Sequence, residues 1–552
     1  MSTAALNRST PGPAGQAPAE PPAGARPAAP VSEEVSQYRW IILIGVMLAS
    51  IMEVLDTTII NVALPQMAGN LGATTTEIAW VSTGYILSNV VVLPMTAWLA
   101  GRFGRKRYLT FSIILFIVAS FFCGTSHSLG EIVFWRILQG AGGAALLSTA
   151  QATLREIFPR DQQASVQAIF TLGIIVAPTL GPTLGGWMTD NYSWSWTFFI
   201  NVPIGLLSLF LVSGFLQDSK YVRAPSGVDW PGIALLTVGL GSLQYVLEEG
   251  NQDDWFESAT ITRLAILAGV SLVALVVWEL WPSNKNPVVD FRVLKNRTLL
   301  ASLFLFLTLG FGLYGGVFIF PLFAQTILHF TPTETGLVLL PGGLATGVGV
   351  IICGRLLGGP KPKVDPRVLI ALGTSIFMWS MWDLGHLTVQ SGIPDTQLAL
   401  ILRGLGLGFL FTPINLTVFG SLDVREVQQA SGLINLTRQL GGSFGIALIG
   451  TYISNQTAFH RTALAQYIYP GNPALLERQQ GLIALLQSHG YTPAQAQAGW
   501  LGMLNQQVQR QAAVMSFNDA FLMILMTFML SAPAILLLKR PNKPAAPGAD
   551  AH

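Results

Sequence analysis

The chain has 552 residues, of which 51% are hydrophobic and 11% are charged, and its formal net charge is +2. Soluble domains carry about 25% charged residues, so this composition excludes an ordinary soluble protein and is typical of a polytopic membrane protein. The small net charge also argues against nucleic acid or an acidic macromolecule as a partner.

The two ends of the chain differ from the rest in composition. Residues 1–37 are rich in Ala, Pro and Gly and contain no apolar run. Such a segment cannot bury a hydrophobic core, so we expect a disordered cytoplasmic tail without a cleavable signal peptide. Residues 539–552 have the same character and are predicted to form a second cytoplasmic tail.

Between the tails lie fourteen long apolar runs, each near the about 20 residues that a membrane-spanning helix needs. Strands of a membrane barrel are short and alternate in polarity, so these continuous runs predict an all-α integral membrane protein with 14 transmembrane helices. The predicted spans are 40–64, 78–100, 108–125, 131–153, 165–188, 197–216, 230–248, 262–281, 299–325, 334–354, 368–386, 396–419, 427–454 and 516–538.

An internal repeat divides these spans into two halves. "RILQGAGG" begins at Arg136 and "RGLGLGFL" begins at Arg403, and "QQAS" follows each of them at a similar interval, at Gln162 and at Gln428. "GR" also ends the second and the tenth span. Repeated bundles with a binding site between them near the midplane are the architecture of secondary transporters.

The repeat predicts two six-helix bundles separated by an inserted pair of helices. The N-terminal bundle is predicted over 38–217, the inserted pair with its linkers over 218–298, and the C-terminal bundle over 299–538. The last of these includes an external loop over 455–515, whose apolar residues recur at helical spacing and predict two short amphipathic helices.

The loops predict how the spans are oriented. Most of the 30 Lys and Arg residues lie in the predicted inner loops and in the tails. By the positive-inside rule, both termini are therefore predicted to be cytoplasmic, and the long loop 455–515 crosses regardless of its charge. Six short predicted outer loops contain no Lys or Arg: "QMAGNLGATTTE", "SHSLG", "TDNYSWS", "EGNQDDWFESAT", "TILHFTPT" and "LTVQSGIPD".

The first span contains two carboxylates, Glu53 and Asp56, in the apolar run "IMEVLDTTIINVALP". On a helix they share one face with Thr57 and Asn61, and this polar face must point to the bundle interior or to a water-filled cavity. A carboxylate balanced between burial and a nearby cation can take up a proton on one side and release it on the other. The alternative is a structural network in which neither acid titrates.

Three arginines lie within predicted spans and stay charged, so each needs an acceptor. Arg403 and Arg438 are predicted to act as charge partners inside the bundle, while Arg136 is a candidate partner of the first-span acids. Snorkelling to the outer headgroups is the alternative for Arg136 and Arg403. Polar groups within spans are the substrate-binding candidates: Asn61, Gln139, Tyr314, Asn415 and Asn435. Residues toward outer helix ends are expected at interfaces: Asp383, His386 and Asp519.

Several segments, in chain order, resemble motifs of the fourteen-helix drug:proton antiporters of the major facilitator superfamily, especially the EmrB type. Two residues depart from the family pattern, because Gly101 replaces an acidic residue and Ser195 replaces the middle of a Trp-Arg-Trp sequence. The matching segments are "LDTTIINVALP" (55–65), "WLAGRFGRKR" (98–107), "RILQG" (136–140), and "GPTLGG" (181–186) followed by "FFINVPIG" (198–205).

The resemblance implies roles for the residues of these motifs. Asp56 is implied as the proton carrier, with Glu53 beside it and Arg136 as partner, since the superfamily packs these helices into one half. The "GPTLGG" glycines are expected to let helices approach closely, and its proline permits bending. Residues implied in gating are Arg102, Gly104 and Arg105 in the inner loop, and Gly181, Pro182, Gly185 and Gly186 in the fifth span.

The predicted function is transport and not catalysis. No loop carries a Ser/His/Asp set, a zinc spacing or "GxxxxGK", so we expect no enzyme, no metal, no cofactor and no ATP-driven pump. The chain resembles an inner-membrane proton-driven antiporter that exports amphipathic or cationic drugs from the cytoplasm or inner leaflet by alternating access. The alternatives are export of a defined metabolite and proton/solute symport.

The EmrB resemblance also implies partners outside the bilayer. It implies a periplasmic adaptor protein and an outer-membrane channel, bound through loop 455–515. The alternative is that the amphipathic helices of this loop pack on themselves as a cap.

Overall fold

The computed structural model describes residues 33–159, 161–219, 227–284, 286–358, 363–469 and 471–538, and the regular elements within these ranges are all helices. This confirms the predicted all-α fold class. The elements are α1 (Glu33–Ile59), η1 (Ile60–Val62), α2 (Leu64–Leu71), α3 (Thr75–Ile78), α4 (Trp80–Val92), η2 (Leu93–Met95), α5 (Thr96–Phe103), α6 (Arg105–Thr125), α7 (Leu129–Ile157), α8 (Gln163–Asn191), α9 (Trp196–Phe199), α10 (Asn201–Phe215), α11 (Trp230–Glu249), η3 (Trp255–Glu257), α12 (Ala259–Leu280), η4 (Phe291–Lys295), α13 (Arg297–Thr326), α14 (Pro332–Leu357), α15 (Pro366–Leu384), α16 (Ile393–Ser421), α17 (Val427–Ala465), α18 (Pro473–Ser488), α19 (Pro493–Ser531) and α20 (Ala534–Leu537).

Ten helical segments in the described part of the chain are long and apolar enough to cross a membrane. They correspond to predicted spans one, two, three, six to ten, twelve and fourteen. The other four predicted spans fall on α7, α8, α15 and α17, of which α7 and α17 are rich in Gly, Ser, Thr and Gln. Helices of this composition pack closely against neighbouring helices. The total of fourteen spans stays a prediction.

Local sequence signals explain several helix starts. Thr74, Thr331 and Thr492 each accept a hydrogen bond from the backbone N–H three residues later, and the Glu or Gln at that position binds back to the threonine N–H. These capping boxes satisfy backbone groups that a helix end leaves without partners. Asp229 and Asp365 cap α11 and α15, each followed by a proline in the first turn.

The chain ends differ in part from the sequence prediction. α1 begins at Glu33, which lies within the segment 1–37 predicted as a disordered tail. Residues 1–32 and 539–552 lie outside the described residues, so the two predicted tails are otherwise untested. The divisions of the chain into bundles at 217/218 and 298/299 stay predictions as well.

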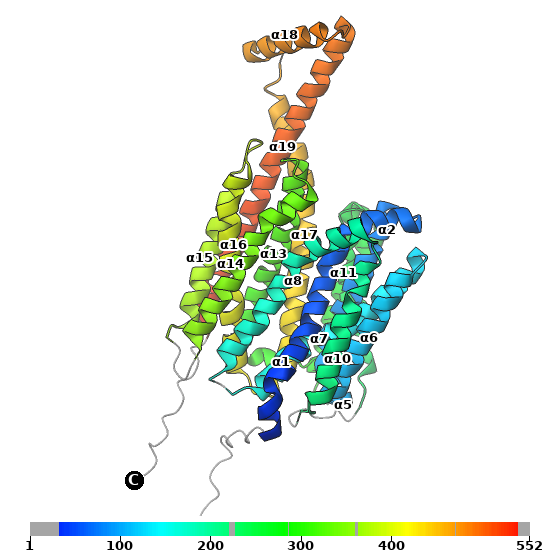
Figure 1. Ribbon diagram of the computed structural model, residues 1–552, viewed down its shortest axis with the longest axis vertical. Coiled ribbons are helices and arrows are strands. Elements are labelled where there is room, and N and C mark those ends of the chain that lie inside the picture. The colour runs from blue at the N-terminus through cyan, green and yellow to red at the C-terminus, as the bar shows by residue number, and fades with distance from the viewer. Residues whose placement is uncertain are drawn as a thin grey trace, which may run out of the picture.

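The predicted external segment 455–515 forms a long helical projection (Figure 1). α17 continues through Ala465 and α19 begins at Pro493, each with 39 residues, so each is about 58 Å long. α18 joins them at the far tip, away from the bundle (Figure 1). We call the end of the bundle that carries this hairpin the upper end, and the end where α1 begins the lower end.

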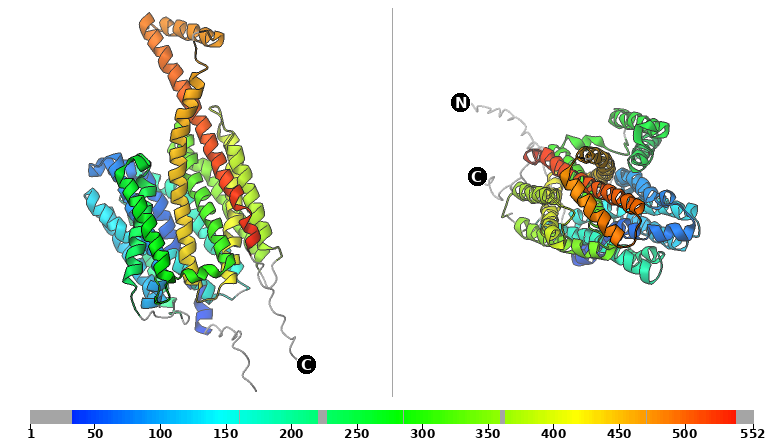
Figure 2. Two further views of the ribbon diagram at one scale, coloured as in Figure 1. Left: turned by 180° about the vertical axis from the view of Figure 1, so that it is seen from behind. Right: turned by 90° about the horizontal axis from the view of Figure 1, so that it is seen from above.

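The helices α1–α10 and the helices α13–α17 lie on opposite sides of a seam (Figures 1 and 2). Along this seam α8 packs against α14, and α7 packs against α17. The inserted helix α11 contacts α4 on one side of the seam and α17 on the other, while α12 packs outside α11. The inserted pair thus covers one edge of the seam.

Glycines allow the close approach of α8 to the end of α1. A Cβ at Gly185 would overlap the Ile59 carbonyl oxygen, and a Cβ at Gly181 would overlap the Thr58 side chain. A Cβ at Gly186 would meet only Val62 Cγ1, at an ordinary 3.7 Å. Two neighbouring glycines of the same motif therefore differ in what they contribute to packing.

We predict that Gly185→Ala destabilises the protein by about 1–3 kcal/mol, because the added methyl group forces α8 away from α1. Gly186→Ala serves as the matched control, and we expect it to be neutral or slightly stabilising. Thermal unfolding of the purified proteins in one detergent measures both effects. Equal melting temperatures for the two variants would contradict the close packing of α1 and α8 at Gly185.

Candidate functional site

Asp56 and Arg136 form an ion pair inside the α1–α10 group. Arg136 Nη1 lies 2.5 Å from Asp56 Oδ2, and the two side chains are 1% and 0% exposed. The same nitrogen donates to Gln139 Oε1 at 2.7 Å, and Arg136 Nε donates to the Val81 carbonyl oxygen at 2.8 Å. The pair joins α1 to α7 and α7 to α4.

The second oxygen of the Asp56 carboxylate is also held. Asp56 Oδ1 accepts from Gln139 Nε2 at 3.0 Å and from Asn201 Nδ2 at 2.8 Å. Asn201 Nδ2 also donates to Ser120 Oγ, which in turn donates to the Phe198 carbonyl. We call Asp56, Arg136, Gln139, Asn201 and Ser120 the Asp56 network. Each of its side chains is buried, and together they satisfy both carboxylate oxygens.

Aromatic rings complete the surroundings of Arg136. Its guanidinium carbon lies 4.2 Å from the centre of the Tyr85 ring and 5.8 Å from that of Phe198. Both distances fall within the range of a cation–π interaction, which is strongest when the site is dry. The charge of Arg136 is thus balanced by one carboxylate, one carbonyl and two rings.

Glu53 lies one helical turn below Asp56 and has different surroundings. Its Oε2 accepts from the Leu147 backbone N–H at 3.1 Å, and it also interacts with Asn89 on α4. The charge nearest to it across the seam is that of Arg438 on α17. Glu53 is 8% exposed, whereas Asp56 is completely enclosed.

A small pocket lies at the seam beside Glu53. Its volume is about 20 Å³, which is enough for a water molecule and too small for a drug-sized ligand. Asn415 Oδ1 is buried in its wall without a hydrogen-bond partner in the structure. This seam pocket is lined by Leu147, Gln151, Thr171, Ile174, Phe306, Phe411, Asn415, Ile434, Asn435 and Arg438.

Hydrogen bonds close the seam below this pocket. Gln151 Oε1 on α7 accepts from Ser431 Oγ at 2.6 Å and from Asn435 Nδ2 at 3.2 Å, both on α17. Gln428 Nε2, nearer the start of α17, donates to Thr149 Oγ1 at 3.2 Å. The lower part of the seam is therefore held by direct polar contacts between the two groups of helices.

Arg403 and Arg438, the other two arginines of the predicted spans, differ from Arg136. Arg438 Nη1 donates to the Tyr314 hydroxyl at 3.0 Å, and Arg403 Nη1 donates to the Gly316 carbonyl at 3.0 Å. Neither forms an ion pair within the described part of the chain. Arg403 is buried and points into the bundle, so it does not extend to the headgroup region.

The structure brings some predicted substrate-binding residues together and separates others. Asn415 and Asn435 line the seam pocket, and Tyr314 contacts Arg438 beside it. Gln139 belongs to the Asp56 network. Asn61 lies apart, because α1 ends at Ile59 and Asn61 is exposed in the turn η1. The predicted polar face of the first span is therefore shorter than its sequence spacing indicated.

The inner loop with the predicted gating residues forms a tight turn at the lower end. Gly104 has φ +87°, a conformation that glycine adopts without strain, and a Cβ there would lie 3.0 Å from Asp218 Oδ1. Arg105 forms an ion pair with Glu156 of α7, and the Lys106 backbone N–H donates to Asp218 at 2.9 Å. Glu156 and Asp218 supply the acidic groups that Gly101 cannot.

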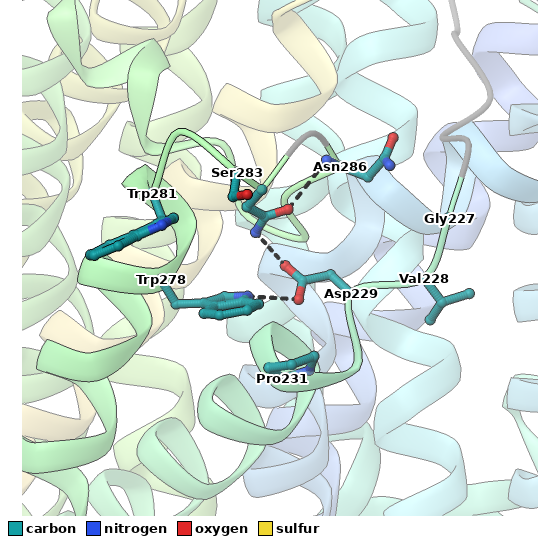
Figure 3. Close-up of a pocket in the computed structure, with 9 residues that line it drawn as sticks. Gly227, Val228, Asp229, Pro231, Trp278, Trp281, Ser283 and Asn286 are labelled. Atoms are coloured by element: carbon teal, nitrogen blue, oxygen red, sulfur yellow. Dashed lines mark hydrogen bonds between the residues drawn. The ribbon is translucent and has the colours of Figure 1, made fainter.

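A second pocket, of about 410 Å³, lies at the lower ends of α11 and α12 (Figure 3). On one side Asp229 accepts from Trp278 Nε1 at 2.8 Å and from Asn284 Nδ2 at 2.7 Å (Figure 3). Asn284 also donates to Glu279, which accepts from the Val289 backbone N–H. These contacts tie α11, α12 and the following linker together, far from the Asp56 network.

Four members of the site were not predicted from the sequence: Asn201, Ser120, Tyr85 and Gln151. Asn201 opens the segment "NVPIG", so the resemblance to the fifth-span motif offered a signal for it. Ser120, Tyr85 and Gln151 lie in apolar runs with nothing in the local sequence to mark them. Among the described residues, no group of three His, Cys, Asp or Glu side chains could hold a metal ion.

Comparison with known proteins supplies relatives over nearly the whole chain. Multidrug export protein EmrB of Haemophilus influenzae is 34% identical over 506 residues, covering 91% of this chain and 96% of that protein. Multidrug export protein EmrB of Escherichia coli K12 is 33% identical over 515 residues, covering 93% and 98%.

A solved structure shows the same fold. The human organic anion transporter MFSD10 (TETRAN) superposes with a TM-score of 0.55 at 12% identity, covering 91% of this chain and all of that one. The sequence profile of the Major Facilitator Superfamily matches residues 46–446, which include the Asp56 network and the seam pocket. This multi-pass membrane chain belongs to the Major Facilitator Superfamily.

Proposed function

We propose that this protein is a proton-driven antiporter of the inner membrane that exports amphipathic or cationic drugs by alternating access. One observation carries the proposal: a buried acid–arginine pair lies one helical turn from a second acid, which binds the backbone of Leu147 in the wall of a pocket between two groups of helices. The names of the two EmrB relatives, multidrug export proteins, support export of drugs over export of one metabolite.

The distribution of basic residues supports an orientation with the lower end in the cytoplasm. Arg102 and Arg105 flank the turn at the end of α5, Arg355 lies in the last turn of α14, and Arg367 begins α15. All of these helix ends belong to the lower end, and positive charge near the membrane favours the cytoplasmic side. The hairpin would then project into the periplasm.

Asp56 is proposed as the proton carrier because protonation would change the packing of α1 and α7. As a carboxylate it holds Arg136, Gln139 and Asn201 through both oxygens. A proton on Asp56 removes the Coulomb attraction, and Arg136 must then find another acceptor or more water. Loss of this contact would free the two helices to move relative to each other.

Glu53 is proposed as the group that links the proton to the substrate. It accepts a hydrogen bond from Leu147, which lines the seam pocket, and Arg438 on the opposite side of the seam acts on its charge. An ionised Glu53 can attract either Arg438 or a cationic substrate, and a protonated Glu53 attracts neither. Competition between a proton and a cationic drug at this carboxyl would produce exchange of one for the other.

The conformation also fits a transport cycle. The seam is closed below the pocket by Gln151 and Gln428, and the pocket holds no more than a water molecule. Substrate from the cytoplasm would enter only after these hydrogen bonds break. We therefore assign the structure to a form that is closed toward the cytoplasm.

Substitution of Asp56 tests its role as the proton carrier. We expect Asp56→Asn to abolish substrate-induced proton release and gradient-driven dye export in proteoliposomes. Breaking a buried ion pair typically costs about 3–5 kcal/mol, so the melting temperature is expected to fall as well. The double variant Asp56→Asn/Arg136→Gln removes both charges and should recover much of the stability while remaining uncoupled.

A comparison with Glu53→Gln separates the two acids. This variant keeps an oxygen to accept from the Leu147 N–H and loses only the charge. We expect it to fold normally and to release fewer protons on substrate addition. If folded Asp56→Asn exports dye with native pH dependence, Asp56 is structural and coupling must be assigned to Glu53.

A cross-link between α7 and α17 tests alternating access. We expect Thr149→Cys/Gln428→Cys, joined by a short bifunctional thiol reagent, to stop export because the lower seam can no longer open. Each single cysteine variant treated with the same reagent is the control. Unimpaired export by the fully cross-linked protein would contradict opening at this seam.

The hairpin of α17, α18 and α19 is the proposed dock for a periplasmic adaptor protein and, through it, an outer-membrane channel. Its exposed side chains include Phe459, Tyr467, Leu485 and Leu501, which are unusually apolar for a surface in water. His460 and Asp519 pair across the hairpin at 2.8 Å, so its base is held independently of its tip.

Replacing residues 466–492 by a short flexible loop tests this role. We expect the shortened protein to export dye in proteoliposomes as the native protein does, because the Asp56 network and the seam are untouched. Drug resistance of cells that express it together with a periplasmic adaptor protein and an outer-membrane channel should be lost. Full resistance with a shortened hairpin would show that the hairpin is only a cap.

A further inference from the structure

The upper end of the inserted helix α11 carries a polar contact that the proposed coupling through Asp56 and Glu53 does not use. Gln244 Nε2 donates to Glu248 Oε1 at 2.8 Å and to Ser443 Oγ of α17 at 2.8 Å. Glu248 is partly buried, and Glu249, the next residue, is 7% exposed. The contact therefore joins an acid of the inserted pair to the helix that carries Arg438.

Gln244 is the informative member of this contact. Its side chain is completely buried, and both hydrogens of its Nε2 are used by Glu248 and Ser443. Its Oε1 is also buried but has no hydrogen-bond donor in the structure. A buried acceptor without a donor destabilises the folded state, so such groups are rarely left alone.

No positive charge compensates the two glutamates within the described residues. Arg263, at the same end of α12, is exposed and pairs with neither of them. The titratable groups nearby are Tyr245 and Asp253, and Asp253 adds negative charge. On α4, the Trp80 ring packs at a tilt against the ring of Tyr245. On α17, the polar group at this contact is Ser443, which accepts from Gln244.

A proton on Glu248 would supply the hydrogen-bond donor that Gln244 Oε1 lacks and would remove one negative charge. The described part of the chain holds no group of acids large enough to bind a metal ion. A carboxylic acid and a primary amide pair through two hydrogen bonds, in which the amide N–H donates to the acid and the acid O–H donates to the amide oxygen. The first of these bonds is present between Gln244 and Glu248, and a proton on Glu248 supplies the donor that Gln244 Oε1 lacks.

We propose that Glu248 is a second proton-binding site, in which the protonated acid pairs with Gln244 and so fastens the inserted helix α11 to α17. Ionisation of Glu248 removes the donor and places a charge beside Glu249, which favours turning the side chain out to water. Gln244 then loses its partner, and the α11–α17 contact weakens. The Trp255 and Asn251 contacts with Thr451, at 2.8 and 3.1 Å, dock the adjacent loop on the same helix.

This inference rests on the proposed function in one respect only: a proton-driven exporter would expose its upper end to the more acidic side of the membrane. The protonation of Glu248 itself is a property of the folded protein. It is therefore testable without substrate, without a gradient and whether or not Asp56 carries a proton.

Infrared difference spectroscopy of the purified protein, titrated with acid and base, measures the C=O stretch of protonated carboxyls. We expect a band at neutral pH that is lost in Glu248→Gln and persists in the matched control Glu249→Gln. In Gln244→Leu the band should move to higher frequency, because the protonated carboxyl loses its amide partner. A neutral-pH band that survives in Glu248→Gln, or is absent from the native protein, would overturn the proposal.

Thermal unfolding gives an independent readout. A group that holds its proton more tightly in the folded state stabilises the fold at low pH, and that contribution is lost as the pH rises through its ionisation. Glu248→Gln mimics the protonated form, so its advantage in melting temperature over the native protein should grow with pH. A difference that stays constant with pH would contradict a titrating Glu248, even if transport proves not to be proton-driven.

Discussion

The ion pair between Asp56 and Arg136 is the interaction on which the arrangement of the first helices depends. A carboxylate and a guanidinium that are almost fully enclosed are stable only if their remaining donors and acceptors also find partners. Here Gln139 of α7, Asn201 of α10 and the Val81 carbonyl of α4 fill those positions. The need to satisfy one charged pair thus fixes the relative positions of α1, α4, α7 and α10.

The seam between the two groups of helices is held by hydrogen bonds between neutral side chains and not by buried charges. No ion pair crosses it in the described part of the chain, and its polar contacts are single hydrogen bonds such as those of Gln151. Hydrogen bonds between neutral groups contribute about 0.5–1.5 kcal/mol each, so a few of them can break and reform with little net cost. The rigid charged network lies inside one half, and the exchangeable contacts lie between the halves.

The sequence predicted the all-α fold and the residues of the charged site to different extents. Long apolar runs identified the helices, and the placement of Glu53, Asp56 and Arg136 in those runs marked them as candidates, because charge in a membrane span is costly. The pairing of Asp56 with Arg136 was expected from the family resemblance, and the structure places them 2.5 Å apart. Whether they couple transport to protons stays a prediction.

Other features of the site could not be predicted from the chain alone. Asn201 lies 145 positions from Asp56, and Gln151 lies 280 positions from Ser431. Uncharged polar residues are common in buried helices, so nothing local separates one that contacts a charge from one that binds its own backbone. The end of α1 at Ile59, which removes Asn61 from the polar face, also depends on tertiary packing.

The two halves of the predicted repeat differ in the partners of their corresponding arginines. Arg136 faces a carboxylate, whereas Arg403, at the corresponding position, binds the carbonyl oxygen of Gly316. A side chain at Gly316 would begin only 3.4 Å from the Arg403 guanidinium, so the glycine leaves room for the arginine but offers it no acid. A carbonyl cannot take up a proton near neutral pH, so Arg403 keeps the same partner and the same charge in every protonation state. In the proposed mechanism, proton-dependent change therefore begins at the acids of α1 and α11, and not at Arg403, and reaches the C-terminal helices across the seam.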